Sequence, residues 1–408
     1  MATRRSTRRT MATAEEPVAV SAPLAAPVVE LPNKKARPAT RQTIETPEEE
    51  AMRVKYEAEL SKVKENLLKQ TFNYYQNLLL KPSQNINQIN NIYYTVWVNY
   101  IGNNLSYDVN RYLRDGMPAS FEISNDGDLE ELYRTFMTIV DYLVDDNPIK
   151  PNTTDKSLID VLAKGLKMKG CSPDKCILQA QQLIWETKDN VKKMLSKMST
   201  VEKLNTLINF ADQSFSAVGP IIIGQDLTRT TSENEIFYRG IGNFSPQDYI
   251  RDIENNPANP AYLSTSTDEK IASWHAKRRT EAQGGDELNK FVIKYVCEPG
   301  IRVIDTLLAL HTPVQASEKE CIFPRGCYST YVSTEVLQQY STQQPVDENN
   351  VIKDISKGIE IINAPLTIIT VKLSGPGAST ADVGGRSRKS RKSRRKISRK
   401  SSRKSRRH

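Results

Sequence analysis

Apolar residues in the first half of the chain recur every three or four positions, which is the spacing of an amphipathic helix. The first run opens at Thr46 as N-cap, with Pro47 at the first helical position and Glu49 completing a capping box. It ends before Pro82. Similar patterns predict helices over 84–101, 128–144, 155–168, 172–198 and 200–216. We therefore predict a helical domain over residues 45–198.

The pattern changes after Ile236, where apolar runs of strand length are separated by Gly, Pro and Asn. The runs are IFYRG, AYLSTS, FVIKYVCEPG, IRVID, ECIFPRG, YSTYVS and LTIITVKL. They predict a twisted, mainly antiparallel sheet with one or two inserted helices, the clearest opening with a capping box from Ser266 to Glu269. The expected fold class is therefore α+β, in which the helical domain precedes a mixed α/β domain over residues 199–375.

Positive charge is concentrated at the two ends of the chain. The 408 residues carry 57 Lys or Arg and 48 Asp or Glu, a net charge of +9. Residues 386–408 contribute +14 and residues 1–41 contribute +5, which leaves −10 for residues 42–385. Segments composed like the two ends cannot bury a core. We therefore expect a disordered basic, Pro-rich arm over 1–44, an acidic folded body, and a disordered Arg/Lys/Ser-rich tail over 376–408.

The C-terminal segment RSRKSRKSRRKISRKSSRKSRRH alternates basic residues with serines. Such a segment neutralises phosphates without sequence preference. It equally suits a nuclear-import signal, a contact with acidic membrane or protein surfaces, or phosphorylation that cancels its charge. A solubilising tail without a partner is the simplest alternative. We expect nucleic acid or another acidic surface as its partner, and its composition resembles the tails of genome-associated proteins of large DNA viruses.

Several classes of protein are disfavoured by the sequence. No apolar run approaches the ~18 residues of a membrane span, and Glu15 and Glu16 interrupt the segment behind the basic N-terminus, so neither a transmembrane segment nor a signal peptide is expected. The five cysteines are expected to be reduced thiols. Cys171 and Cys176 lack a second pair at zinc spacing, so no metal is expected. The expected location is the cytoplasm or nucleus of a host cell, or a virion.

Two short segments carry candidate binding residues. Arg239, in FYRG, offers a planar fork of donors to a phosphate or carboxylate. Gly240 beside it allows a ligand to approach the backbone. Further along, in YLSTSTDEK, Ser264 faces the same side as Ser266 if the segment is extended. Ser266 is expected to cap the following helix, which leaves Ser264 free to serve a site.

The third candidate segment is QASEKECIFPRG, where Glu318 and Glu320 stand at the predicted start of a strand. Strands are depleted in glutamate. Residues i and i+2 of a strand share a face, so both carboxylates are expected to point to one place. Like charges held this close repel each other and shift each other's protonation. The pair is therefore either solvated or present for chemistry.

The order of these signals, aromatic-Arg-Gly, then Ser-Thr-Ser, then Glu-x-Glu, resembles the arginine-serine-glutamate class of mono-ADP-ribosyltransferases. VIKYVCEPGIRVID resembles the family's strand, Pro-Gly turn and strand, and EKECIFPRG resembles its Glu-x-Glu strand. The resemblance covers about residues 200–375, and its gap between Arg239 and Ser264 is on the short side for the class. Some of the preceding helices resemble the helical N-terminal part of bacterial binary-toxin enzymatic components.

The resemblance implies NAD⁺ as substrate and an arginine side chain of a protein as acceptor. Arg239 would hold the pyrophosphate. Glu320 would stabilise an oxocarbenium-like ribose, and Ser264 would orient Glu320 and line the nicotinamide pocket. Glu318 would position the acceptor guanidinium and help remove its proton. The implied NAD-binding residues are Arg239, Gly240, Ser264, Thr265, Ser266 and Glu320.

The resemblance also points to two loops beside the site. RRTEAQGGDELNK occupies the place of the family's mobile loop, where Gly284 and Gly285 would supply flexibility. Arg278 or Arg279 would contact phosphate and nicotinamide there, and the alternative for both is a solvated charge at a helix end. LHTPVQAS occupies the place of its substrate-recognition turn. The ring that stacks on nicotinamide is left open between three aromatic residues, Tyr262, Phe244 and Tyr249.

Two other functions stay open at this point. In a nucleic-acid-associated structural protein with an inactive transferase-like domain, the tail is the working part. In an NAD⁺ glycohydrolase the ribose passes to water, since Glu320 alone can promote cleavage. The joint presence of Arg239, Ser264, Glu318 and Glu320 favours an active transferase.

Overall fold

The computed structural model describes residues 46–83, 86–102, 105–123, 125–149, 153–167, 171–216, 227–282, 290–306, 318–345 and 359–377. The predicted arm over 1–44 and the basic segment 386–408 lie outside these residues. Contacts divide the chain into Met1–Lys55 and Tyr56–His408. The hydrophobic cores and the candidate site all lie within the second unit.

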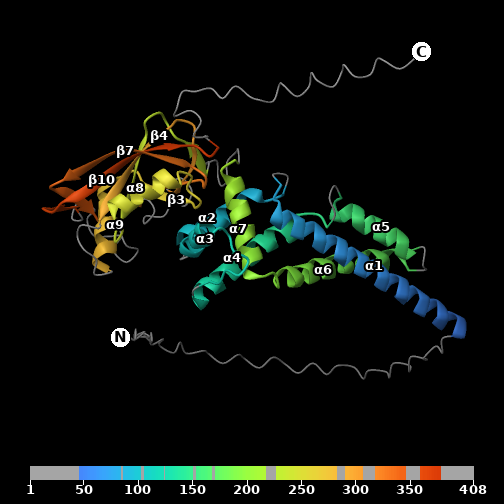
Figure 1. Ribbon diagram of the computed structural model, residues 1–408. Helices are drawn as coiled ribbons and strands as arrows, with labels where there is room; N and C mark the ends of the chain where they lie inside the picture. The colour runs from blue at the N-terminus through green and yellow to red at the C-terminus, as the bar shows by residue number, and fades with distance from the viewer. Residues whose placement is uncertain are drawn as a thin grey trace, which may run out of the picture. The chain divides into compact units, whose positions relative to one another are not determined.

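In the described residues, helices precede the sheet, as predicted (Figure 1). They are α1 (Pro47–Leu80), α2 (Ile89–Gly102), α3 (Leu105–Arg114), α4 (Asp126–Asp146), α5 (Asp155–Lys167), α6 (Pro173–Leu195) and α7 (Thr200–Ser214). The helical spacing located six of them to within a few residues, whereas α3 was not predicted. With ten residues, α3 is too short to stand out beside α2.

The predicted start of α1 is confirmed. The backbone N–H of Thr46 donates to Glu49 Oε2 at 2.8 Å, and the N–H of Glu49 donates to Thr46 Oγ1 at 3.3 Å. Two backbone donors that have no partner inside the helix are thereby satisfied. Pro47 occupies the first helical position and α1 ends at Leu80, two residues before Pro82.

The largest hydrophobic core forms where α2, α4 and α7 pack together. Trp97, Phe136 and Phe210 are fully buried in it. Burial of side chains of this size contributes roughly 1.5–3 kcal/mol each. The indole Nε1–H of Trp97 donates to Ser214 Oγ at 2.8 Å, so its one polar group is also satisfied. Since α7 shares this core, packing does not mark the predicted boundary between residues 198 and 199.

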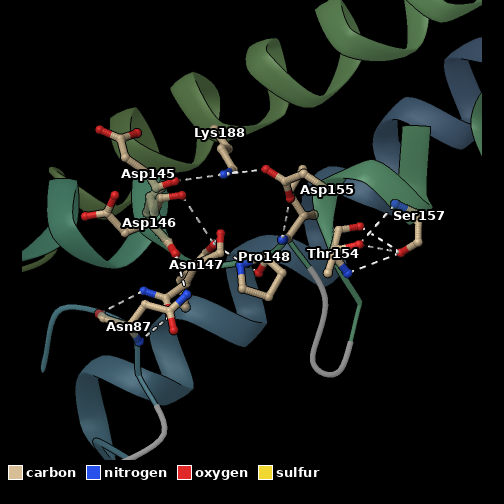
Figure 2. Close-up of polar contacts among 12 residues, drawn as sticks. Asn87, Asp145, Asp146, Asn147, Pro148, Thr154, Asp155, Ser157 and Lys188 are labelled. Atoms are coloured by element: carbon tan, nitrogen blue, oxygen red, sulfur yellow. Dashed lines mark hydrogen bonds and ion pairs between the residues drawn. The ribbon is translucent and has the colours of Figure 1, made fainter. Parts of the chain in front are cut away.

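Polar side chains hold the connection from α4 to α5 (Figure 2). The N–H of Asn87 donates to Asn147 Oδ1 at 2.8 Å, and its side-chain amide donates to the carbonyl of Asp146 at 2.7 Å. Lys188 of α6 forms an ion pair with Asp155 of α5 at 2.8 Å. These contacts satisfy a carbonyl at the C-terminal end of α4 and tie α5 to α6. These polar side chains therefore have a structural role.

The second half of the chain forms one eight-stranded sheet in the order β1-β5-β6-β3-β2-β4-β10-β7. Its strands are β1 (Thr228–Thr230), β2 (Ile236–Ile241), β3 (Leu263–Ser266), β4 (Phe291–Cys297), β5 (Arg302–Asp305), β6 (Glu320–Phe323), β7 (Tyr328–Leu337) and β10 (Leu366–Ser374). Neighbours pair antiparallel, except β4 and β10, which pair parallel. The predicted α+β class with a mainly antiparallel sheet is confirmed. A separate hairpin joins β8 (Tyr340–Gln343) and β9 (Ile359–Ile362).

Two helices cover opposite faces of the sheet near β2. Side chains alternate along a strand, so Phe237 and Tyr238 face opposite sides. Phe237 packs in a core with Ile253 of α8 (Pro246–Asn255), and Tyr238 packs in another core with Ala272 of α9 (Glu269–Ala282). Only α9 was clearly indicated by the sequence.

The predicted capping box between Ser266 and Glu269 is wrong. The carboxylate of Asp268 accepts from the N–H of Lys270 at 3.0 Å, and the Asp268 carbonyl accepts the first helical bond from Ala272 at 3.2 Å. Asp268 is therefore the N-cap of α9. The Ser266 hydroxyl donates instead to the carbonyl of Glu318 at 2.8 Å. The same hydroxyl accepts from the N–H of Asp268 at 3.1 Å, so Ser266 joins the start of α9 to the distant segment at Glu318.

The helices and the sheet meet at Tyr262, just before β3. Its fully buried ring makes edge contacts with Trp97 and Tyr100 of α2, at centroid distances of 5.5 and 5.7 Å. Its hydroxyl donates to Asp212 Oδ1 at 2.8 Å, and its backbone N–H donates to Asn110 Oδ1 at 3.1 Å. Side chains of α2, α3 and α7 therefore hold the segment that leads into β3.

Candidate active site

The site lies where the sheet opens between β2 and β3. β2 pairs with β4 along its whole length, but it pairs with β3 only at Tyr238 opposite Ser266. Beside this point lies a cavity of about 130 Å³, called here the glutamate cavity. Its lining residues are Tyr238, Arg239, Gly240, Ser264, Thr265, Ser266, Ile271, Ala272, His275, Arg279, Glu318 and Glu320. The three segments singled out in the sequence therefore converge on one cavity.

Ser264 and Glu320 are joined directly. Antiparallel pairing of β3 with β6 sets Ser266 opposite Glu320 and Ser264 opposite Ile322. The hydroxyl of Ser264 donates a hydrogen bond to Glu320 Oε1. The hydroxyl of Thr265 donates to the carbonyl of Cys321 at 2.8 Å, so its role in the described residues is to hold β3 against β6. Ser264 thus fixes the orientation of the Glu320 carboxyl.

Glu318 and Glu320 reach the cavity by a different route from the one predicted. β6 begins only at Glu320, and Lys319 has a φ of +49°. A residue in this left-handed region reverses the chain locally, so strand alternation does not apply to Glu318. The turn is held by the N–H of Thr267, which donates to the Lys319 carbonyl at 3.1 Å, and by an ion pair between Lys319 and Asp268 at 2.8 Å. The carboxylates converge because of this turn.

Both carboxyl groups are harder to ionise than free glutamate. Burial raises the pKa of Glu320 to about 7, with the charge of Glu318 adding to the rise and the hydrogen bond from Ser264 and the charge of Arg239 opposing it. Burial also raises the pKa of Glu318. Two carboxyl groups with raised pKa in one cavity are typical of a site for proton transfer or for stabilising a developing cation.

Arg239 spans the opening between the two strands. Its Nη1 donates to the carbonyl of Ser264 at 3.3 Å. Its side chain also lines a second cavity of about 370 Å³, called here the arginine cavity. Arg239 therefore lines two cavities, and its guanidinium can offer donors to an anion.

The structure gives Gly240 a role in packing that the sequence did not predict. A Cβ atom at this position would lie 1.9 Å from the Ala272 carbonyl oxygen and 2.6 Å from the Ala276 nitrogen. Both atoms belong to the backbone of α9. Gly240 lines the glutamate cavity, but its missing side chain makes room for a helix.

Helix α9 adds two residues that the sequence did not single out together, His275 and Arg279. Burial lowers the pKa of His275 to about 4, and the charges of Arg279, Arg278 and Arg239 lower it further, so the imidazole is neutral at pH 7. Arg279 lines the glutamate cavity, whereas Arg278 lies over the ring of Trp274, 5.0 Å from its centroid. Of the two arginines predicted as alternatives, Arg279 is the one at the cavity. The available signal in the sequence was the spacing of His275 and Arg279, which places them on one face of α9 at i and i+4.

The three aromatic residues considered for stacking all line the arginine cavity and not the glutamate cavity. Tyr262 is buried against the helices, and the hydroxyl of Tyr249 lies 3.0 Å from that of Tyr295. Phe244 is 38% exposed and is the most accessible of the three. The loop residues Gly284 and Gly285 and the segment LHTPVQAS lie outside the described residues.

No protein-family model matches the chain, and no curated protein matches its sequence. Within the described ranges, no cluster of three or more His, Cys, Asp or Glu side chains is placed to hold a metal ion. Across the same residues, no helix has both the length and the apolar character needed to cross a membrane.

Proposed function

We propose that the protein transfers ADP-ribose from NAD⁺ to an arginine side chain of a protein target. The observation that carries this proposal is the hydrogen bond from Ser264 to Glu320 inside a cavity that Arg239 and Glu318 also line. These four residues are the ones to which the resemblance assigns roles. The contribution of the fold to this proposal is a mainly antiparallel sheet whose strands carry the site residues.

In this proposal Glu320 acts on the ribose. The bond between the ribose C1′ and the nicotinamide nitrogen breaks, the electron pair leaves with nicotinamide, and positive charge develops on the ribose. The Glu320 carboxylate stabilises this charge and accepts a hydrogen bond from a ribose hydroxyl. Burial disfavours its ionised form when no cation is present, so the approach of a positively charged ring favours ionisation when it is needed. Ser264 keeps the carboxylate oriented.

Glu318 then serves the acceptor. A guanidinium is a poor nucleophile while charged, and it loses its proton only to a well-placed base. Glu318 lines the same cavity as Glu320 and has a raised pKa, which makes it a better base than free glutamate. The acceptor nitrogen bonds to C1′ and its proton passes to the Glu318 carboxylate. Arg239 holds the pyrophosphate throughout, which fixes the donor relative to both carboxylates.

Replacing Glu318 with glutamine is expected to lower protein labelling about a hundredfold while nicotinamide release continues, because the base is lost but the group that stabilises the ribose is kept. The measurement follows labelled ADP-ribose on proteins of a cell lysate and nicotinamide in solution. Glu254→Gln on α8, an exposed position, is the matched control. Labelling sensitive to hydroxylamine would support an arginine linkage.

The same experiment separates the rival functions. Nicotinamide release by the wild-type protein without any protein label would identify an NAD⁺ glycohydrolase. If the wild-type protein gives no protein label and no nicotinamide release, both enzymatic functions are refuted. A structural protein whose basic tail is the working part then remains. Equal labelling by the wild type and Glu318→Gln would remove Glu318 from the mechanism.

We further propose that the tail over 386–408 binds nucleic acid or another acidic surface. Its 14 positive charges predict binding to duplex DNA at low salt that weakens steeply as salt rises. A chain ending at residue 385 is expected to lose this binding and to keep nicotinamide release. Filter binding or fluorescence anisotropy at two salt concentrations checks both. DNA binding retained by the shortened chain would overturn the assignment.

A further inference from the structure

The arginine cavity is lined from both halves of the chain. α8, the loop before β3, and β2 contribute most of its lining, and α3 contributes Arg114 from the helical half. Among the described lining residues, Arg114 and Arg239 are the cations and Asp252 is the acidic residue. Phe244 and Tyr249 add aromatic surface. A cavity with two guanidinium groups and aromatic walls suits a ligand that carries both phosphate and an aromatic ring.

Arg239 lines both cavities, the glutamate cavity together with residues of α9 and the arginine cavity together with residues of α8. A dinucleotide carries its pyrophosphate between two nucleosides. If the reacting ribose lies at Glu320 in the glutamate cavity, the pyrophosphate follows at Arg239, and the rest of the molecule extends into the arginine cavity. Arg114 lines this second cavity together with Arg239.

Arg114 shares the arginine cavity with Arg239. It is the last residue of α3, with an exposed side chain. The pKa of Tyr100 is raised by burial, lowered by a hydrogen bond from Asn110, and affected by the charges of Glu320, Arg239 and Arg114. All three charged groups are therefore within electrostatic range of one hydroxyl. No carboxylate in the described part of the chain lies within salt-bridge distance of Arg114 or Arg239.

We infer that the helical half completes the substrate cleft, with Arg114 supplying a second guanidinium that binds the pyrophosphate of the dinucleotide beside Arg239. The inference rests on the proposed function, because it takes NAD⁺ as the ligand. Two arginines can contact the two phosphates at once, and such charge-assisted hydrogen bonds are among the strong ones. Arg114 is a binding residue in this assignment, and the bond-breaking step is left to Glu320.

The test measures binding of ADP and of adenosine to the full chain by calorimetry. Arg114→Ala is expected to weaken ADP binding about tenfold and to leave adenosine binding unchanged, because only ADP carries the phosphates. Arg114→Lys keeps a charge but loses the planar fork, so its ADP affinity should be intermediate. Arg251→Ala on α8 is the matched control, since Arg251 is exposed and does not line the cavity. In nicotinamide release, Arg114→Ala should raise KM for NAD⁺ and leave kcat unchanged.

The outcomes separate this inference from the proposed function. Equal ADP affinity for the wild type and Arg114→Ala would overturn the role of Arg114 and leave the transferase proposal standing. An equal loss of ADP and adenosine binding would also overturn it, because the effect would not depend on phosphate. Weaker ADP binding in Arg114→Ala, together with no nicotinamide release by the wild type, would support the phosphate site and refute the transferase. Absence of ADP binding by the wild type would refute both.

Discussion

Glu320→Gln is expected to reduce nicotinamide release and protein labelling together by about a thousandfold, the largest effect expected from a single change in this chain. Glutamine has nearly the shape of glutamate and still accepts a hydrogen bond from Ser264, but it cannot carry the negative charge that stabilises a cationic ribose. Both products depend on that charge, so both should fall equally. Kinetics with labelled NAD⁺ check this, with Glu335→Gln on strand β7 as an exposed control.

The same variant is expected to be more stable than the wild type above pH 7. Burial raises the pKa of Glu320 from 4.5 to about 7 on folding, so the fold favours the protonated carboxyl. The wild type is therefore fully stabilised by this group below pH 4.5 and loses that stability as the pH rises through 7. At pH 8 the wild type loses on the order of 3 kcal/mol of its free energy of unfolding in this way. Glutamine does not ionise, so the variant avoids this loss.

Thermal unfolding at pH 4.5 and pH 8 tests the stability difference. Glu320→Gln should unfold several degrees above the wild type at pH 8, and the two should approach each other at pH 4.5. A variant less stable than the wild type at pH 8 would show that the carboxylate is stabilised in the fold, contrary to its burial. Full activity in a correctly folded Glu320→Gln would remove Glu320 from the chemistry.

Gly240→Ala is expected to destabilise the sheet by about 3 kcal/mol or more. The new methyl group would lie 1.9 Å from the Ala272 carbonyl oxygen, far inside van der Waals contact. Because the colliding atoms are backbone atoms of α9, no side-chain rotation relieves the clash. Helix α9 must move away from β2, which displaces His275 and Arg279 from the glutamate cavity. Activity should fall together with stability.

Gly165→Ala on α5 is the matched control for this change. A Cβ atom there meets nothing within 4 Å, and alanine favours a helix over glycine by about 1 kcal/mol, so this variant should be slightly more stable. Chemical denaturation of both variants gives the two free energies of unfolding. Wild-type stability in Gly240→Ala would show that α9 does not pack against β2 at this close distance.

Much of the secondary structure follows from local patterns. The capping box at Thr46 and Glu49 is present as predicted, because both partners lie within one turn and need no other contact. The strands near 236 and 291 were located by short β-rich runs between turn residues. The local pattern placed the N-cap of α9 two residues too early, at Ser266 and not at Asp268. Ser266 donates to the Glu318 carbonyl, and Asp268 caps α9 in its place.

The sequence by itself determined the helical and sheet-forming halves of the chain and the residues that gather at the glutamate cavity, because periodicity, turn residues and a motif in fixed order are all local. Only the tertiary structure decided that Lys319 turns the chain between the two glutamates, that Gly240 makes room for α9, and that Arg114 shares a cavity with Arg239. These features depend on which segments meet when hydrophobic faces are buried, and residues in different secondary-structure elements carry no local signal of their meeting.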